Sequence, residues 1–113
     1  MSIEAAVRES LATATGAILV TAEAGRAGET VQHLRAAKAD IVLLLLDSSV
    51  PAIERAMLVA AIGPLAVELA SYTRIGAIDV MAGAEEGDVA AAARFLAAAR
   101  STTGQILRVA PEI

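Results

Sequence analysis

The sequence predicts an α/β fold, a three-layer sandwich in which a parallel sheet of about four strands carries helices on both faces. Short apolar runs alternate with longer segments of helical periodicity along the chain. Strands separated by helices cannot pair as hairpins, so they are expected to lie parallel and to be joined by right-handed crossovers. A length of 113 residues without a linker or an internal repeat suits one domain, residues 1–113.

The first part of the chain predicts a helix, a strand and a second helix. Residues 2–12 repeat apolar side chains at helical spacing. Residues 16–21 form a short apolar run that is typical of a strand covered on both sides. Gly25 and Gly28 then open a predicted helix that runs from residue 28 to about residue 37.

The strongest strand signal is residues 41–46, six apolar residues closed by Asp47. Ser49 is expected to cap the helix that begins near Pro51 and ends near Ser71. The remaining elements continue the alternation, with a strand at 75–81, a helix with an acidic first turn at 85–100 and a strand at 105–109.

Composition excludes several classes of function. The net charge is -4 and the nine basic residues are spread along the chain, so no basic face is expected to bind nucleic acid. The chain has no cysteine, which excludes thiol catalysis and thiolate metal sites. The single His33 is expected to be partly exposed and neutral. Asp79, inside a predicted strand, and the run Glu85, Glu86 and Asp88 could suggest a cation site, but acids at a helix start are ordinary partners of the helix dipole, so we expect no metal site. No signal-peptide pattern opens the chain and no apolar run is long enough to span a bilayer, so we expect a cytoplasmic protein.

Two helical segments are apolar on every side. Residues 56–67 carry no charge, and residues 89–99 carry only Arg94. One face of a helix on a small sheet can bury about half of these residues, so the rest are expected to meet another subunit. The alternative is that alanine fills these helices for its helix propensity alone, leaving small outward side chains.

Three segments in the second half of the chain resemble one family. They are Leu65-Ala66-Val67-Glu68-Leu69-Ala70, Arg74-Ile75-Gly76-Ala77-Ile78 and Thr103-Gly104-Gln105-Ile106-Leu107. In this order they resemble the C-terminal half of the short-chain dehydrogenase/reductase family, over residues 48–109. The resemblance implies a truncated Rossmann-like domain whose long helix and closing helix and strand form subunit contacts. The interface residues that we expect are Met57, Leu58, Ile62, Leu65, Leu69, Phe95, Leu96 and Ile106.

The residues that this family uses for catalysis are missing at the matching positions. Counting back from Leu65, Arg55 falls where the family has its catalytic Lys, and Pro51 falls where it has its Tyr. Proline has no proton to donate, so the resemblance implies that the general acid is lost. Ser49 could match the serine that steadies the substrate carbonyl, although we expect it to serve as a helix cap.

The first strand and turn could match the dinucleotide motif of the family. In the degenerate motif at Thr21, Gly25 and Gly28, the first Thr and the last Gly fit, and Asp47 lies where a ribose-binding acid would follow. Ala22 and Arg26 replace glycines that let a pyrophosphate approach, so we expect no cofactor. Alternatively, the same segment could match the fourth strand of the family.

Taken together, these features predict a non-catalytic member of the family that forms a homo-oligomer or a hetero-oligomer with a full-length active reductase. The alternative is a small signalling module, since Asp47 at a strand end is similar to the phosphoacceptor of response-regulator receivers, and Asp47-Ser48-Ser49 is similar to the phosphoacceptor region of anti-sigma-factor antagonists. An active reductase with unusual residues is a third hypothesis.

Overall fold

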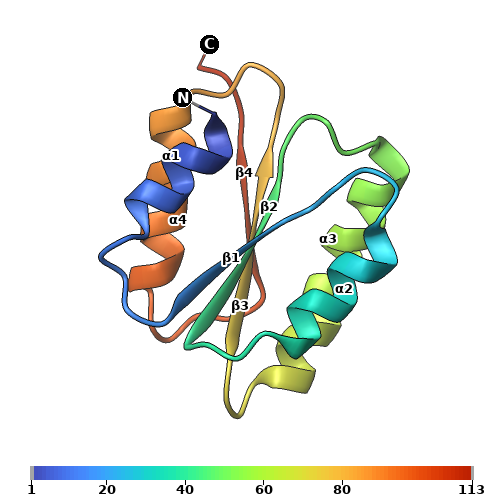
Figure 1. Ribbon diagram of the computed structural model, residues 1–113, viewed down its shortest axis with the longest axis vertical. Coiled ribbons are helices and arrows are strands. Elements are labelled where there is room, and N and C mark those ends of the chain that lie inside the picture. The colour runs from blue at the N-terminus through green and yellow to red at the C-terminus, as the bar shows by residue number, and fades with distance from the viewer. Residues whose placement is uncertain (1, 113) are drawn as a thin grey trace.

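The computed structural model describes residues 2–112 and confirms the predicted α/β architecture. A four-stranded parallel sheet in the order β1-β2-β3-β4 lies between two pairs of helices (Figure 1). Helices α2 and α3 pack together on one face, and α1 and α4 pack together on the other. The elements in chain order are α1 Ile3–Ser10, β1 Ala17–Thr21, α2 Ala27–Ala36, β2 Ile41–Leu46, α3 Ala52–Leu69, β3 Arg74–Val80, α4 Glu86–Ala98 and β4 Gln105–Val109.

The position of each strand in the sheet follows from its burial. All six residues of β2 are buried, as are the last six of β3, so these two apolar strands occupy the centre. β1 and β4 form the two edges, and β4 is exposed along much of its length. Alternate side chains of β2 enter different cores: Leu44 packs under α2 and α3, whereas Leu43 and Leu45 pack under α1 and α4.

The last crossover differs from the sequence-based expectation. The strands succeed one another across the sheet in chain order, but α4 covers the face opposite to α2 and α3. The first two crossovers are right-handed (Figure 1), so the crossover from β3 through α4 to β4 is left-handed, and the prediction that all are right-handed is wrong. Strands that are apolar on both sides need helices packed on both faces of the sheet. Because α1 alone covers only part of one face, α4 packs beside it and buries the rest.

Helix α4 lies close to the sheet because β3 contains a glycine there. A Cβ atom added to Gly76 would lie 3.3 Å from Leu43 Cδ2 and 3.4 Å from Leu96 Cδ1. Gly76 therefore lets Leu96 of α4 approach the backbone of the central strand. The closeness of the helix is fixed by the absence of a side chain at one position.

Helix ends agree with the predicted boundaries within a few residues, but the predicted cap of α3 is wrong. Ser2 caps α1 by accepting a hydrogen bond from Ala5 N–H at 3.0 Å. The N-cap of α3 is Pro51, which makes no side-chain hydrogen bond, and Ser49 instead donates to Asp47 Oδ1. The Asp47 carboxylate also accepts the Ser49 N–H at 2.9 Å, so a local turn satisfies the serine before the helix begins.

Candidate functional site

The carboxyl ends of β2 and β3 are the place where a parallel sheet of this topology can bind a ligand. The chain leaves β2 towards α3 on one face, and it leaves the neighbouring β3 towards α4 on the other face. Divergence of two adjacent connections creates a crevice beyond the strand ends. These ends lie at the top of the sheet in Figure 1.

In this chain the crevice is crossed by the side chain of Arg55. Its guanidinium donates to the carboxylate of Asp79 and to the main-chain carbonyls of Leu46 and Asp47. Arg55 lies in the first turns of α3, directly above the ends of both strands. Its side chain is 20% exposed, so most of it lies inside the molecule and joins α3, β2 and β3.

Asp79 is the acceptor that holds this arrangement together. Its side chain is only 4% exposed, and it accepts from two arginines on different elements. Arg108, directly opposite Asp79 in the β3-β4 register, donates from Nε to Oδ2 at 3.3 Å but remains 70% exposed. Two guanidiniums thus compensate a buried carboxylate, as the low polarity of the interior requires.

At the two positions that the sequence comparison predicts for a catalytic pair, the structure has a proline and an arginine that is hydrogen-bonded within the chain. Pro51 is exposed and supplies only its ring, and the donors of Arg55 contact Asp79 and two carbonyls. Ser49 hydrogen-bonds to Asp47 rather than facing a free cavity. Arg55 and Asp79 therefore link two elements, and Asp47 and Ser49 form a local turn.

The turn after β1 contains the other predicted motif. Gly25 has a φ of +80°, which a glycine adopts without strain, and its N–H donates to Glu54 of α3 at 2.6 Å. No atom lies within 4 Å of the Cβ positions of Gly25 or Gly28. The hydroxyl of Thr21 is buried without a hydrogen-bond partner. Thr21, the glycines and Asp47 all lie near the carboxyl edge, but Asp47 is engaged by Ser49.

Carboxylates of the chain itself surround the N-terminus of α2. Arg26, the N-cap, pairs with Glu23 at 3.5 Å and with Glu29 at 3.1 Å. With His33 and Thr21 these residues line a cavity of about 180 Å³. A pyrophosphate at this helix end would meet two negative side chains, which is the opposite of what an anion site requires.

A metal site is not found among the residues that the structure describes. Within residues 2–112, no three histidine or acidic side chains are grouped so that they could hold an ion. His33 is exposed, as the sequence analysis expected. In the same part of the chain no helix has both the length and the hydropathy needed to cross a membrane.

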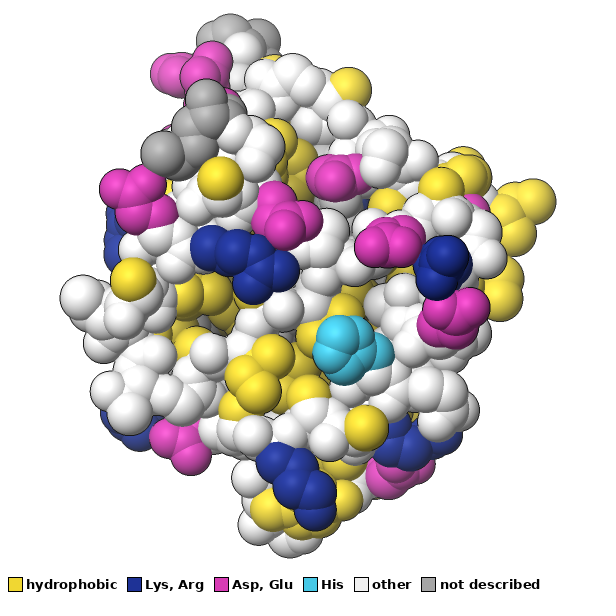
Figure 2. Space-filling view, viewed as in Figure 1, with side chains coloured by type: hydrophobic (Ala, Val, Ile, Leu, Met, Phe, Trp, Pro, Cys, Tyr) yellow, Lys and Arg dark blue, Asp and Glu magenta, His cyan; other side chains and the backbone are white. Residues whose placement is uncertain are grey.

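The outward face of α3 is apolar along most of the helix. Its exposed side chains recur at helical spacing and include Ile53 at 77%, Met57 at 57% and Val67 at 81% exposure, with only alanine, glycine and proline between them on that face. Figure 2 shows hydrophobic side chains protruding at the upper right, where the first turns of α3 lie. Its exposed charged residue is Glu68 in the last turn, which pairs with Arg35, so most of this face lacks the polar cover that surface helices usually present to water.

Several residues that were predicted for the interface lie in the core instead. Exposure is between 0% and 3% for Leu58, Ile62, Leu65, Leu69 and Leu96. Because these leucines and the isoleucine fill the spaces between α3 or α4 and the sheet, they cannot contact another subunit. Met57, Phe95 and Ile106 are exposed, and Phe95 lies on α4, on the far side of the sheet from α3. Sequence periodicity could have separated the two sets, since the buried and exposed residues of α3 lie on opposite sides of a helical wheel.

The partnership between Arg55 and Asp79 was not predicted. An isolated acid inside an apolar strand was noted at Asp79, and the signal that could have located its partner was an arginine in the first turn of the preceding helix. Two pieces of information are missing from the sequence: the register that places Arg108 beside Asp79, and the tilt of α3.

Comparison with protein families found one match. A family model described as short chain dehydrogenase-like protein (SDR-like) matches residues 9–109 of the chain. That span includes β1 to β4 and helices α2, α3 and α4 in full. The comparisons with curated proteins and with solved structures gave no match.

Proposed function

This chain belongs to the short chain dehydrogenase-like (SDR-like) family, and we propose that it is a non-catalytic subunit that oligomerises and supports an active reductase partner. The observation that carries the proposal is the position of Arg55. Its guanidinium bridges Asp79 and the ends of β2, in the crevice where the family resemblance expects a Lys that assists a Tyr. The chain has one tyrosine, Tyr72, and it follows α3 instead of opening it.

The chemistry of this crevice supports a scaffolding role. A general acid must release a proton to the substrate, and a guanidinium in a protein keeps its protons across the physiological pH range. The position of the expected Tyr is occupied by Pro51, which has no exchangeable proton. The ion pair would also have to break before a substrate carbonyl could reach the strand ends.

The outward face of α3 supports the oligomeric part of the proposal. Its exposed apolar side chains run from Ile53 to Val67, almost the whole helix. Small residues between them, such as Ala60 and Gly63, would let a second helix approach closely. Burial of this face against another subunit removes apolar area from water at about 25 cal/mol per Å².

Two surfaces are available for such contacts. Ile106 faces the α3 side of the sheet at the β4 edge, so it extends the α3 face. Phe95 is 61% exposed on α4, in the opposite layer. In this proposal the α3 face pairs with an equivalent helix, and the partner's substrate pocket is stabilised through that contact. Neither the fold nor the family match favours the signalling alternative.

The test compares two methionine substitutions. Met57→Glu places a charge on the outward face of α3, whereas Met81→Glu places the same charge on a methionine that is 43% exposed after β3. Light scattering should show an oligomer for the wild type and for Met81→Glu, and a smaller species for Met57→Glu. A wild-type protein that stays monomeric at micromolar concentration, alone and when mixed with a full-length reductase of the family, would contradict the oligomeric role.

The catalytic part is tested separately. The purified chain is mixed with a nicotinamide cofactor and an acyl thioester ketone, and cofactor absorbance is followed. We expect no turnover by the chain alone. Turnover that is lost in Arg55→Met would show instead that the crevice is a working active site.

A further inference from the structure

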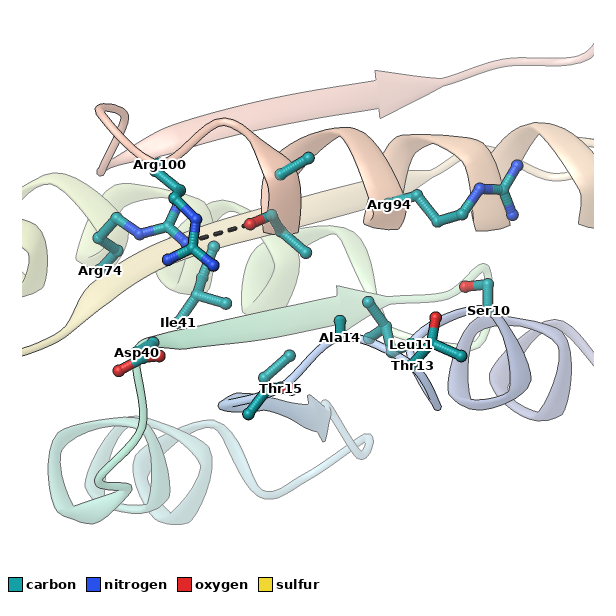
Figure 3. A pocket seen from close by; sticks show the side chains of 13 residues that line it. Ser10, Leu11, Thr13, Ala14, Thr15, Asp40, Ile41, Arg74, Arg94 and Arg100 are labelled. Carbon is teal, nitrogen blue, oxygen red and sulfur yellow. Dashed lines mark hydrogen bonds between the residues drawn. The ribbon is translucent and has the colours of Figure 1, made fainter.

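The largest of the cavities described lies at the amino ends of the strands, whereas Arg55 and Asp79 lie at their carboxyl ends. It has a volume of about 400 Å³ and lies between the end of α1, the second half of α4 and the first residues of β1, β2 and β3. This volume is within the range of small-molecule sites, roughly 300–1,000 Å³. Figure 3 shows it as a trough with α4 on one side and β2 and the end of α1 on the other.

The trough has polar ends and an apolar middle. Arg94 lies at one end, near the hydroxyls of Ser10 and Thr13, and Arg74 and Arg100 lie at the other (Figure 3). Leu11, Ala14, Ile41, Ala97 and Ala98 contribute apolar surface to the same cavity. Three guanidiniums and one carboxylate line the cavity, although the chain as a whole is acidic, and the carboxylate of Asp40 lies at the end with Arg74 and Arg100 (Figure 3).

The pairing of the arginines singles out this cavity. Among the residues that the structure describes, five arginines pair with carboxylates: Arg8, Arg26, Arg35, Arg55 and Arg108. Arg74 donates to main-chain carbonyls. Arg94 and Arg100 are the two arginines of this part of the chain for which neither kind of side-chain partner is found, and both line the trough.

Arg74 makes the end of α4 suitable for an anion. A helix C-terminus presents unpaired carbonyls and a partial negative charge, which would repel an anion. Arg74 donates to the carbonyls of Leu96, Ala97 and Ala99 at 3.3, 3.1 and 3.0 Å. The guanidinium therefore satisfies these carbonyls and offsets their charge, while Arg100 beside it has its donors free for a ligand.

We propose that this trough binds a small organic dianion in which two carboxylate or phosphate groups are separated by a short apolar body. One anionic group pairs with Arg94, the other with Arg100 beside Arg74, and the apolar body lies over Leu11 and Ile41. Arg94 lies within α4 and Arg100 lies beyond its end, so the two guanidiniums are at opposite ends of the trough (Figure 3). This spacing favours a ligand of several carbons over a single oxyanion. This site lies at the amino ends of the strands and shares no residue with the crevice at their carboxyl ends.

The experiment titrates isotope-labelled full-length chain with pimelate, a linear dicarboxylate, and with hexanoate, which has one carboxylate. Low ionic strength is used because exposed charges are screened by salt. In NMR spectra we expect chemical-shift changes that saturate with ligand concentration at Thr13, Ala97, Arg94 and Arg100. Pimelate should bind about tenfold more tightly than hexanoate because it makes a second charge-assisted pair. Inorganic pyrophosphate, which lacks the apolar body, should bind more weakly than pimelate.

Variants decide which residues bind the ligand. Arg94→Gln and Arg100→Gln should each weaken pimelate binding about tenfold and leave hexanoate with the remaining arginine. Arg94→Lys keeps a positive charge, so it should weaken pimelate binding less than Arg94→Gln does. Arg26→Gln removes the same charge near the carboxyl ends of the strands and should leave the affinity for pimelate unchanged. Circular dichroism of the exposed variants checks that they are folded.

Three results would overturn the proposal: equal affinity for pimelate and hexanoate, pimelate binding that survives in both glutamine variants, or tighter binding of pyrophosphate than of pimelate. The first two would remove the second anion site, and the third would remove the role of the apolar body.

Discussion

The guanidinium of Arg55 and the carboxylate of Asp79 form an ion pair across the carboxyl ends of the two central strands. The pair joins the first turns of α3 to β3 through side chains that are 20% and 4% exposed. Because these ends are where a parallel sheet binds ligands, one contact has two effects: it ties a helix to the sheet and it occupies the crevice.

Loss of Arg55 should destabilise the fold far more than loss of Arg108. Arg55→Met leaves the Asp79 carboxylate buried with one exposed partner, and we expect the free energy of unfolding to fall by about 3 kcal/mol. Arg108→Met removes a partner that is 70% exposed, and the loss should stay below about 1 kcal/mol. Urea denaturation of both variants measures the difference. Equal losses would mean that Arg55 is not the principal partner of Asp79.

Arg74 should stabilise the end of α4. Arg74→Met leaves the carbonyls of Leu96, Ala97 and Ala99 without this donor. We expect the free energy of unfolding to fall by about 2 kcal/mol. Arg74→Lys should recover only part of it, since an ammonium cannot match the planar fork of donors. Amide hydrogen exchange should become faster in the last turn of α4. Unchanged exchange there would argue against a capping role.

A methyl group at Gly76 should be costly, in contrast to one at Gly87. Gly76→Ala places a Cβ atom 3.3 Å from Leu43 and 3.4 Å from Leu96, inside a packed core. We therefore expect the free energy of unfolding to fall by about 1 kcal/mol or more. Gly87 of α4 has no atom within 4 Å of its Cβ position, so Gly87→Ala should stabilise the helix by about 0.5 kcal/mol. Thermal unfolding of the two variants should shift in opposite directions.

Two threonines should respond oppositely to the same substitution. The Thr21 hydroxyl is buried without a partner, so Thr21→Val should raise the free energy of unfolding by up to about 1 kcal/mol. Thr30 donates to the Arg26 carbonyl at 2.9 Å, so Thr30→Val should lower it by about 1 kcal/mol. Chemical denaturation gives both values. A loss at Thr21 would indicate that its hydroxyl finds a partner in solution.

The elements of the fold were predictable because each carries a local signal. The six apolar residues of β2 and its boundaries are confirmed, and β4 also begins and ends where predicted. The cap of α3 was predicted wrongly because the helix has Pro51 as its N-cap, so Ser49 lies outside the capping position and its hydroxyl donates to Asp47 instead. Which of two local hydrogen-bond arrangements such a serine adopts depends on distances that a sequence does not contain.

The candidate site was predicted in part. That Pro51 and Arg55 replace a catalytic pair stays a prediction, and the structure shows that Arg55 bridges Asp79 and two strand-end carbonyls. The interface prediction counted apolar residues without assigning a side of the helix. Five of those residues proved to be core because α3 and α4 turn them towards the sheet.

By itself, the sequence determined the order and type of the helices and strands, because hydrophobic periodicity and turn residues act over a few positions. Only the tertiary structure decided the left-handed last crossover, the ion pair between Arg55 and Asp79, and the trough between Arg94 and Arg100. Each of these depends on residues far apart in the chain, and their meeting is set by how helices pack on the two faces of the sheet.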